Sequence, residues 1–137
     1  MFTAWLVAAM LAVAGTAAAA DVTGVWRPPA GGAEIEISPC GDSMCGRLID
    51  SDDLRKNPDA RDTDNHNLAL RSRPVKGLLM MYGFHRADEA WVGGTIYDPS
   101  DGMSYRMSMK LLAPDKLQIR GCLVGPLCRA QSWRRVK

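Results

Sequence analysis

One stretch of the sequence decides the fold, because it predicts a β-hairpin. It reads Trp91-Val92-Gly93-Gly94-Thr95-Ile96-Tyr97-Asp98-Pro99-Ser100-Asp101-Gly102-Met103-Ser104-Tyr105-Arg106-Met107-Ser108-Met109-Lys110-Leu111. Pro99 presets φ in the turn, and Gly102 can take the positive φ that closes it. After the turn, apolar and polar residues alternate, which places Met103, Tyr105, Met107, Met109 and Leu111 on one face and Ser104, Arg106, Ser108 and Lys110 on the other. This pattern predicts an antiparallel strand with one solvated face.

Further short strands are expected on both sides of the hairpin, at residues 24–27, 33–38, 45–49, 78–84, 116–122 and 131–136. Alternation turns Ile35 and Ile37 inward, and likewise Leu117 and Ile119. Residues 85–89 read as a polar turn, and residues 67–70 as a single helical turn in a chain with no other helix signal. About eight consecutive antiparallel strands predict an all-β fold, an up-and-down β-barrel whose closure removes exposed sheet edges.

Residues on the first and last strands support closure of the barrel. Trp26 lies in a Gly-x-Trp on the first strand, and Arg134 and Arg135 lie on the last strand. In a closed barrel these strands are neighbours, so one of the two arginines is expected to stack on Trp26, a contact worth about 1–2 kcal/mol when desolvated. This arrangement resembles the lipocalin-like (calycin) signature, although Gly-x-Trp alone is a common motif.

The one long irregular segment is residues 50–76, which is polar, acidic and interrupted by Pro58 and Pro74. A segment of this length is usually functional or disordered. Its carboxylates suit Ca²⁺, but their spacing is not that of a helix–loop–helix calcium site, so a solvated loop is the favoured interpretation. The candidate oxygen ligands in this segment are Asp59, Asp62, Asp64 and Asn65.

Residues 1–20 carry no charged side chain and end in Ala17-Ala18-Ala19-Ala20 before Asp21. They predict a secretory signal peptide, cleaved after Ala20, with an uncleaved membrane anchor as the competing interpretation. Residues 21–137 then form a single domain, large enough to bury roughly 65% of its unfolded surface. We expect a periplasmic or secreted bacterial protein.

The four cysteines form two local pairs, Cys40 with Cys45 and Cys122 with Cys128. An even count in an exported protein favours disulfides, and the turn-like sequence inside each gap favours local pairing. A four-thiolate metal site or a redox pair is the alternative, but neither gap has the Cys-x-x-Cys spacing.

The net charge of +2 is too small to indicate a nucleic-acid or membrane partner, and we expect a monomer without cofactors. An enzyme is disfavoured because no catalytic motif is present. Gly41-Asp42-Ser43 is similar to the start of an esterase block, but no histidine follows His85 to act as the base, and the cysteine turn explains these residues.

A broader resemblance spans nearly the whole mature chain. Its motifs run in order: Gly24-x-Trp26, Cys40-Gly41 with Cys45-Gly46, Asn57-Pro58-Asp59, Leu70-Arg71-x-Arg73-Pro74, Trp91-x-Gly93-Gly94-x-Ile96-Tyr97-Asp98-Pro99, Gly121-Cys122 and Trp133-x-Arg135. As a set they resemble the bacterial secreted family catalogued as domain of unknown function 2147. The resemblance implies a small exported barrel-like domain and no established activity, so it assigns no catalytic residue.

Candidate binding residues come from the long loop and the hairpin: Asn57, Asp59, Arg71, Arg73, Trp91, Tyr97 and Tyr105. The first hypothesis is a non-enzymatic envelope protein that binds a small apolar ligand inside the barrel, provided that the interior is hollow. The second is an interaction module that contacts an envelope protein through residues 50–76. The third is an enzyme that acts on an envelope substrate, which is disfavoured for the reason given above. A further alternative is a copper-binding protein lined by Met103, Met107 and Met109 with Met80 or Met81, although methionine more often fills cores.

Overall fold

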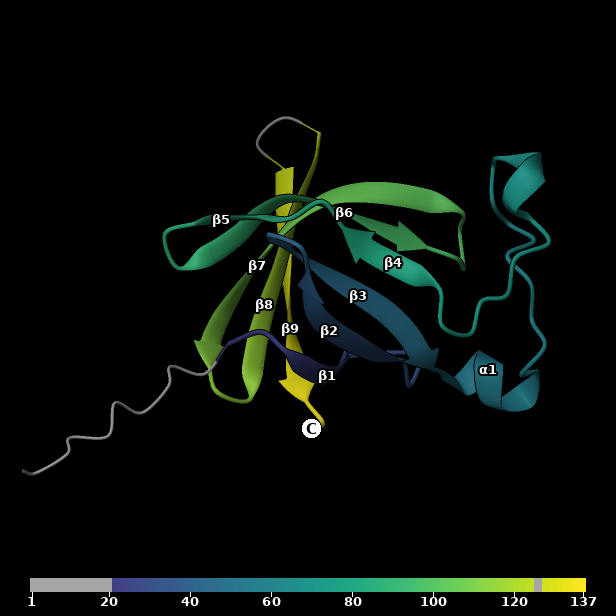
Figure 1. Ribbon diagram of the computed structural model, residues 1–137, viewed down its shortest axis with the longest axis horizontal. Helices are drawn as coiled ribbons and strands as arrows, with labels where there is room; N and C mark the ends of the chain where they lie inside the picture. The colour runs from purple at the N-terminus through teal and green to yellow at the C-terminus, as the bar shows by residue number, and fades with distance from the viewer. Residues whose placement is uncertain (1–20, 125–126) are drawn as a thin grey trace, which may run out of the picture.

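The computed structural model describes residues 21–124 and 127–137, so the expected signal peptide lies outside the described residues. The described chain is almost entirely β-structure (Figure 1). Its elements are β1 (Gly24–Arg27), β2 (Glu34–Cys40), β3 (Ser43–Asp50), α1 (Asp52–Lys56), η1 (Leu68–Leu70), β4 (Leu79–Tyr82), β5 (His85–Ala87), β6 (Ala90–Asp98), β7 (Met103–Ala113), β8 (Lys116–Val124) and β9 (Leu127–Arg135).

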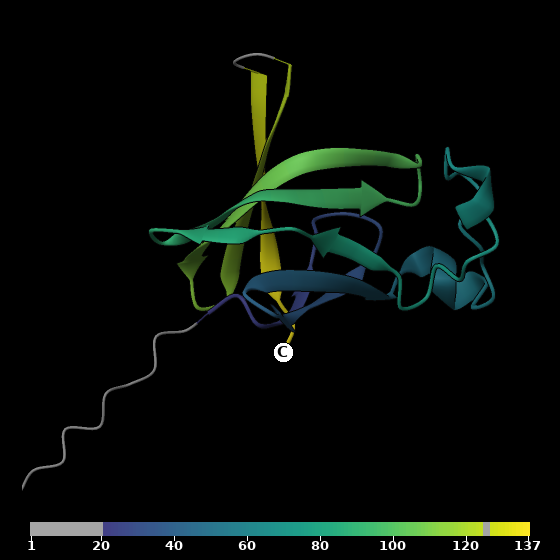
Figure 2. The ribbon, with the colours of Figure 1, turned by 45° about the horizontal axis from the view of Figure 1, so that its top comes forward.

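The sheet closes on itself. Its strands follow the order β4-β3-β2-β1-β9-β8-β7-β6, and β6 pairs with β4 to complete the ring. Every strand pair among the described residues is antiparallel. Figure 2 shows the strands wrapping around a common interior, with the α1–η1 segment at one end. The predicted up-and-down antiparallel barrel is thereby confirmed.

The apolar run at residues 78–84 does not form one continuous strand. β4 ends at Tyr82, Gly83 takes a φ of 77°, and the chain resumes as β5, which also pairs with β6. The expected polar turn at residues 85–89 is therefore wrong in its first half. His85 to Ala87 pair with β6, and the actual turn is made at Asp88, whose φ is 53°.

The central hairpin is present as predicted, with β6 and β7 joined by a turn that Gly102 closes at a φ of 70°. A bulge interrupts β6 between Trp91 and Gly94, at a Gly93 with a φ of 67°. The extra residue shifts the alternation, so that Trp91 packs against the core and Tyr97 faces outward. Gly94 makes room for the buried ring of Phe84, because a Cβ there would collide with that ring.

Closure is completed at the Trp26 end of the barrel. Trp26 is fully buried, and the guanidinium carbon of Arg135 lies 4.3 Å from its ring centroid. Arg135 also donates hydrogen bonds to the backbone oxygens of Asp21, Thr23 and Pro114. Arg134, the other candidate, is exposed on β9 opposite Arg27 of β1.

The segment between β3 and β4 is more ordered than its composition suggests. Ser51 caps α1 by accepting a hydrogen bond from the Leu54 amide, and Leu54 is buried in the core, so the expectation of no helix there is wrong. The helical turn expected at residues 67–70 is present as η1, capped by Asn67. In the part of the chain that the structure describes, no helix has the length and apolarity to span a membrane.

Both local cysteine pairs form disulfides. Cys40–Cys45 bridges the paired ends of β2 and β3, and Cys122–Cys128 joins β8 to β9. The four-thiolate metal site is therefore wrong, because all four sulfur atoms are bonded in pairs. The turn expected between β8 and β9 falls partly on residues 125–126, outside the described residues.

Candidate functional site

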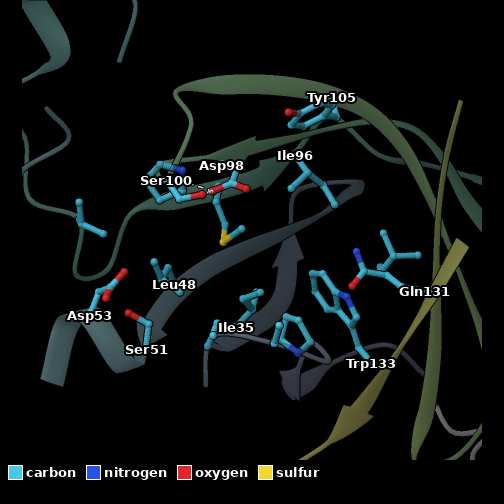
Figure 3. Close-up of a pocket in the computed structure, with 18 of the residues that line it drawn as sticks. Ile35, Leu48, Ser51, Asp53, Ile96, Asp98, Ser100, Tyr105, Gln131 and Trp133 are labelled. Atoms are coloured by element: carbon cyan, nitrogen blue, oxygen red, sulfur yellow. Dashed lines mark hydrogen bonds between the residues drawn. The ribbon is translucent and has the colours of Figure 1, made fainter. Parts of the chain in front are cut away.

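A cavity of about 920 Å³ extends from the barrel interior and is partly open to solvent, and its volume is within the range typical of small-molecule sites. Ile35, Leu48, Met80 and Ile96 form apolar walls around it, and Trp133 extends into the same space from β9 (Figure 3). The apolar walls of this cavity face water when no ligand is bound, so a ligand with matching apolar surface gains free energy by entering it.

One end of the cavity is covered by α1, the following loop and the β6–β7 turn. Leu54, Ala60 and Val75 contribute apolar surface at this end. The charged side chains there are three carboxylates and one guanidinium: Asp53, Asp64, Asp98 and Arg61. We name this the acidic end of the cavity. Figure 3 shows Asp53 and Ser51 at α1 across from Asp98 and Ser100 of the hairpin turn.

The other end lies along β9. β1 is short, and on β9 it pairs only with Arg134 and Arg135, so among the described residues the stretch 127–132 of β9 has β8 as its sole strand neighbour. Figures 1 and 2 show the β8–β9 hairpin rising beyond the rest of the barrel. Arg129, Gln131 and Trp133 of β9 line the cavity here, and Pro28 and Ala30 of the β1–β2 connection lie across the gap.

A buried network fixes the long loop to the outside of the barrel. Asp62 is 1% exposed and accepts hydrogen bonds from the Tyr97 hydroxyl at 2.6 Å, the Arg73 Nε at 2.8 Å and the Asn65 amide at 2.9 Å. The Arg73 guanidinium also lies 5.2 Å from the Tyr97 ring centroid. The interpretation of this acidic loop as fully solvated is therefore wrong for Asp62, which is a structural anchor.

The electrostatics of this network follow from its burial. Desolvation raises the pKa of Asp62, but the hydrogen bonds from Tyr97, Asn65 and Arg73 outweigh it and leave that pKa below 3.8. Desolvation, reinforced by the neighbouring Asp62 carboxylate, raises the pKa of Tyr97 to about 12. At neutral pH the carboxylate is ionised and the phenol is protonated, so the network is a stable anchor and holds no group poised for proton transfer.

The predicted binding residues are distributed over several places. Tyr105 lines the cavity, whereas Tyr97 is on the outer face in the Asp62 network. Trp91 packs against the core, with the Arg86 guanidinium 5.6 Å from its ring centroid. Arg71 donates to the backbone oxygen of Asn65.

Two further candidates lie in the loop itself. Asn57 ends α1 and accepts a hydrogen bond from the Asp59 amide through its side chain. Both residues are exposed. With Arg71 and Arg73 they shape the loop, and none of these four residues lines the cavity.

The structure adds cavity residues that the sequence did not indicate, above all Gln131, Arg129 and the cavity-facing side of Trp133. Trp133 stood out in the sequence only as part of a Trp-x-Arg motif. Its role depends on the gap beside β9, which follows from the shortness of β1 and has no local sequence signal.

The metal hypotheses are supported unequally. Over residues 21–124 and 127–137, no three His, Cys, Asp or Glu side chains group closely enough to hold a metal ion. Of the methionines considered for copper, Met80 and Met107 line the cavity, Met81 and Met109 are buried in the core, and Met103 is exposed at the end of β7.

A closed antiparallel barrel with a cavity, a stacked Trp–Arg pair at its closed end and disulfide-bonded hairpins defines a lipocalin-like fold. A solved structure described as "Protein HP1028 from the human pathogen Helicobacter pylori belongs to the lipocalin family" has the same fold, with a TM-score of 0.75 and 18% identity over 85% of this chain and 84% of that one. Residues 24–135 match the family model "Uncharacterized protein conserved in bacteria (DUF2147)", and the chain belongs to this family. No curated protein sequence matches it.

Proposed function

We propose that this protein is an exported, non-enzymatic binding protein that holds a small apolar ligand inside its barrel. The cavity of about 920 Å³, with Ile35, Leu48, Met80 and Ile96 in its walls, is the observation that carries the proposal. A barrel of eight strands can be filled by its own side chains or can hold one small ligand, and the unfilled interior supports the second arrangement. The lipocalin-family neighbour supports it by analogy of fold.

Export is part of the same proposal. Both disulfides suit an oxidising compartment such as the periplasm, and residues 1–20 have the composition of a signal peptide.

One observation favours a second function, in which the loop contacts an envelope protein. The Asp62 network holds residues 60–75 against the barrel while leaving Leu68 of η1 72% exposed, the most exposed large hydrophobic side chain among the described residues. A Leu68→Asp change that abolished capture of a defined envelope partner, without altering ligand binding, would support this second function.

The ligand-binding proposal is tested with a neutral apolar fluorescent probe, N-phenylnaphthylamine. The purified protein is expected to bind it saturably, with a rise in probe fluorescence. Ala33 lines the cavity, so Ala33→Trp should fill it and weaken binding at least about tenfold. Ala87→Trp is the matched control, because Ala87 is exposed on β5 and does not line the cavity.

Thermal unfolding of both variants verifies that they fold. Equal binding by wild type and Ala33→Trp would show that the probe lies outside the cavity. No binding by the wild-type protein would contradict the proposal.

A further inference from the structure

The cavity wall formed by β9 carries a row of hydrogen-bond donors. Arg129, Gln131 and Trp133 occupy alternate positions on β9, share one face of the strand and all line the cavity. Figure 3 shows Gln131 and Trp133 extending into the same part of the cavity. A guanidinium, an amide and an indole N–H thus follow one another from the gap beside β9 towards the interior.

The innermost of these donors has no partner. Trp133 is 4% exposed, and its Nε1 atom makes no hydrogen bond to any described residue. The corresponding atom of Trp26, by contrast, donates to the Val22 oxygen at 2.8 Å. A buried donor without an acceptor is costly, so a ligand that places an oxygen acceptor beside Trp133 recovers that cost.

The two ends of the cavity differ in the charge of the side chains that line them. At the acidic end, Asp53, Asp64 and Asp98 outnumber Arg61, whereas Arg129 is the charged lining residue on the β9 side. A negative group is therefore repelled from the α1 end and attracted towards β9. Between the two ends the walls are apolar, which suits a hydrocarbon chain.

We infer that the ligand is an amphiphile with an oxyanionic head group, held head-first against Arg129, Gln131 and Trp133, with its chain extending past Ile35 and Met80 towards α1. This inference rests on the proposed function and adds the chemical class of the ligand and its orientation. A carboxylate and a phosphate monoester both supply the required acceptor oxygens and negative charge.

The inference is tested by calorimetric titration of the purified protein with four amphiphiles of equal chain length, each below its aggregation concentration. They are dodecanoate, dodecyl phosphate, dodecanol and dodecyltrimethylammonium. Both anions are expected to bind at least about tenfold more tightly than the alcohol, and the cation more weakly than the alcohol. The stronger of the two anions identifies the source of the head group, a fatty acid or a phosphorylated lipid.

Two variants locate the head group. Trp133→Phe keeps the ring but removes the N–H donor, and Arg129→Ala removes the cation. Each should weaken anion binding about tenfold, equivalent to about 1.4 kcal/mol. Arg129→Ala should leave dodecanol binding nearly unchanged, and Trp133→Phe should weaken dodecanol less than the anions, because a neutral hydroxyl is the weaker acceptor. The matched controls are Trp91→Phe, whose buried Nε1 is also unpartnered but lies outside the cavity lining, and Arg120→Ala on the neighbouring strand β8.

Failure of the inference and failure of the proposed function give different binding results. If the protein binds dodecanol and N-phenylnaphthylamine but prefers neither anion, the inference is overturned while the proposed function stands. The same holds if both variants weaken the alcohol and the anions equally. If no amphiphile and no probe binds, the proposed function fails. Arg129 is exposed, so its variant provides a test even if Trp133→Phe does not fold.

Discussion

The Tyr97 hydroxyl donates a 2.6 Å hydrogen bond to the carboxylate of Asp62, a residue 35 positions earlier in the chain. This contact connects the outer face of β6 to the loop that covers the acidic end of the cavity. Arg73 and Asn65 bind the same carboxylate, so one buried group fixes both sides of the loop. Asp62 therefore holds in place the loop that covers the acidic end of the cavity.

Removing members of this network should loosen the loop before it unfolds the barrel. We expect Tyr97→Phe to lower the free energy of unfolding by about 1–3 kcal/mol, because Asp62 loses one buried donor. Asp62→Ala should cost more, about 3–5 kcal/mol, since it leaves Arg73 without its partner. Urea denaturation measures both, and hydrogen exchange should show residues 60–75 losing protection first.

The control for this comparison is Tyr105→Phe, which removes an exposed hydrogen bond to Asp101 and should change stability little. Equal effects of the two tyrosine substitutions would contradict the anchoring role of Asp62.

The same network predicts a pH dependence with a defined sign. The pKa of Tyr97 rises from 10 to about 12 on folding, so its contribution is complete below pH 10 and is lost as the pH rises towards 12. The loss amounts to roughly 2–3 kcal/mol. The pKa of Asp62 is lowered, so its contribution is present above pH 3.8 and is lost as the pH falls through the folded-state value. Thermal melts of wild type and Tyr97→Phe should converge at high pH.

A substitution at Gly102 tests the contact between the hairpin turn and the loop residue Asp64. A Cβ at this position would collide with the backbone oxygen of Asp64, and the φ of 70° already favours glycine. Gly102→Ala should destabilise the protein by about 2–4 kcal/mol. Gly41→Ala is the matched control, because its φ of 62° is similar but no atom lies within 4 Å of the added Cβ. The difference between the two variants measures the docking contact, and equal losses would rule that contact out.

Barrel closure depends on Arg135 more than on its neighbour. Arg135 stacks on Trp26 and donates to three backbone oxygens, whereas Arg134 is exposed. Arg135→Ala should therefore lower the free energy of unfolding by about 2–4 kcal/mol. Arg134→Ala should change it by less than about 0.5 kcal/mol. Denaturant titration of the two single variants decides this, and similar losses would contradict the closing role of the Trp26–Arg135 pair.

Local sequence pattern predicted those parts of the fold where each residue's environment follows from its neighbours. The alternation in β7 and β8, the Gly102 turn and the local disulfides are of this kind. The faces of β6 could not be predicted, because the bulge at Gly93 moves Tyr97 to the outside while Trp91 stays inside. A bulge changes the period of two on which the prediction depends.

The candidate site was harder to predict, because its decisive features are relationships between distant segments. In the sequence, nothing distinguishes Asp62 from the solvated acids around it. Its role follows from the hydrogen bonds that Tyr97 and Arg73 donate to it in the folded chain. Trp133 and Gln131 become cavity residues because β1 is too short to cover β9. Tyr105 was predicted as a candidate binding residue, and its side chain does line the cavity.

The most direct test of the central claim is native mass spectrometry of the protein recovered from the periplasm, before and after mild organic extraction. We predict a discrete mass above that of residues 21–137 with two disulfides, which disappears on extraction and is absent from Ala33→Trp. The extra mass would identify the ligand class. An unextracted protein with only the mass of the disulfide-bonded chain would contradict a ligand carried in the cavity.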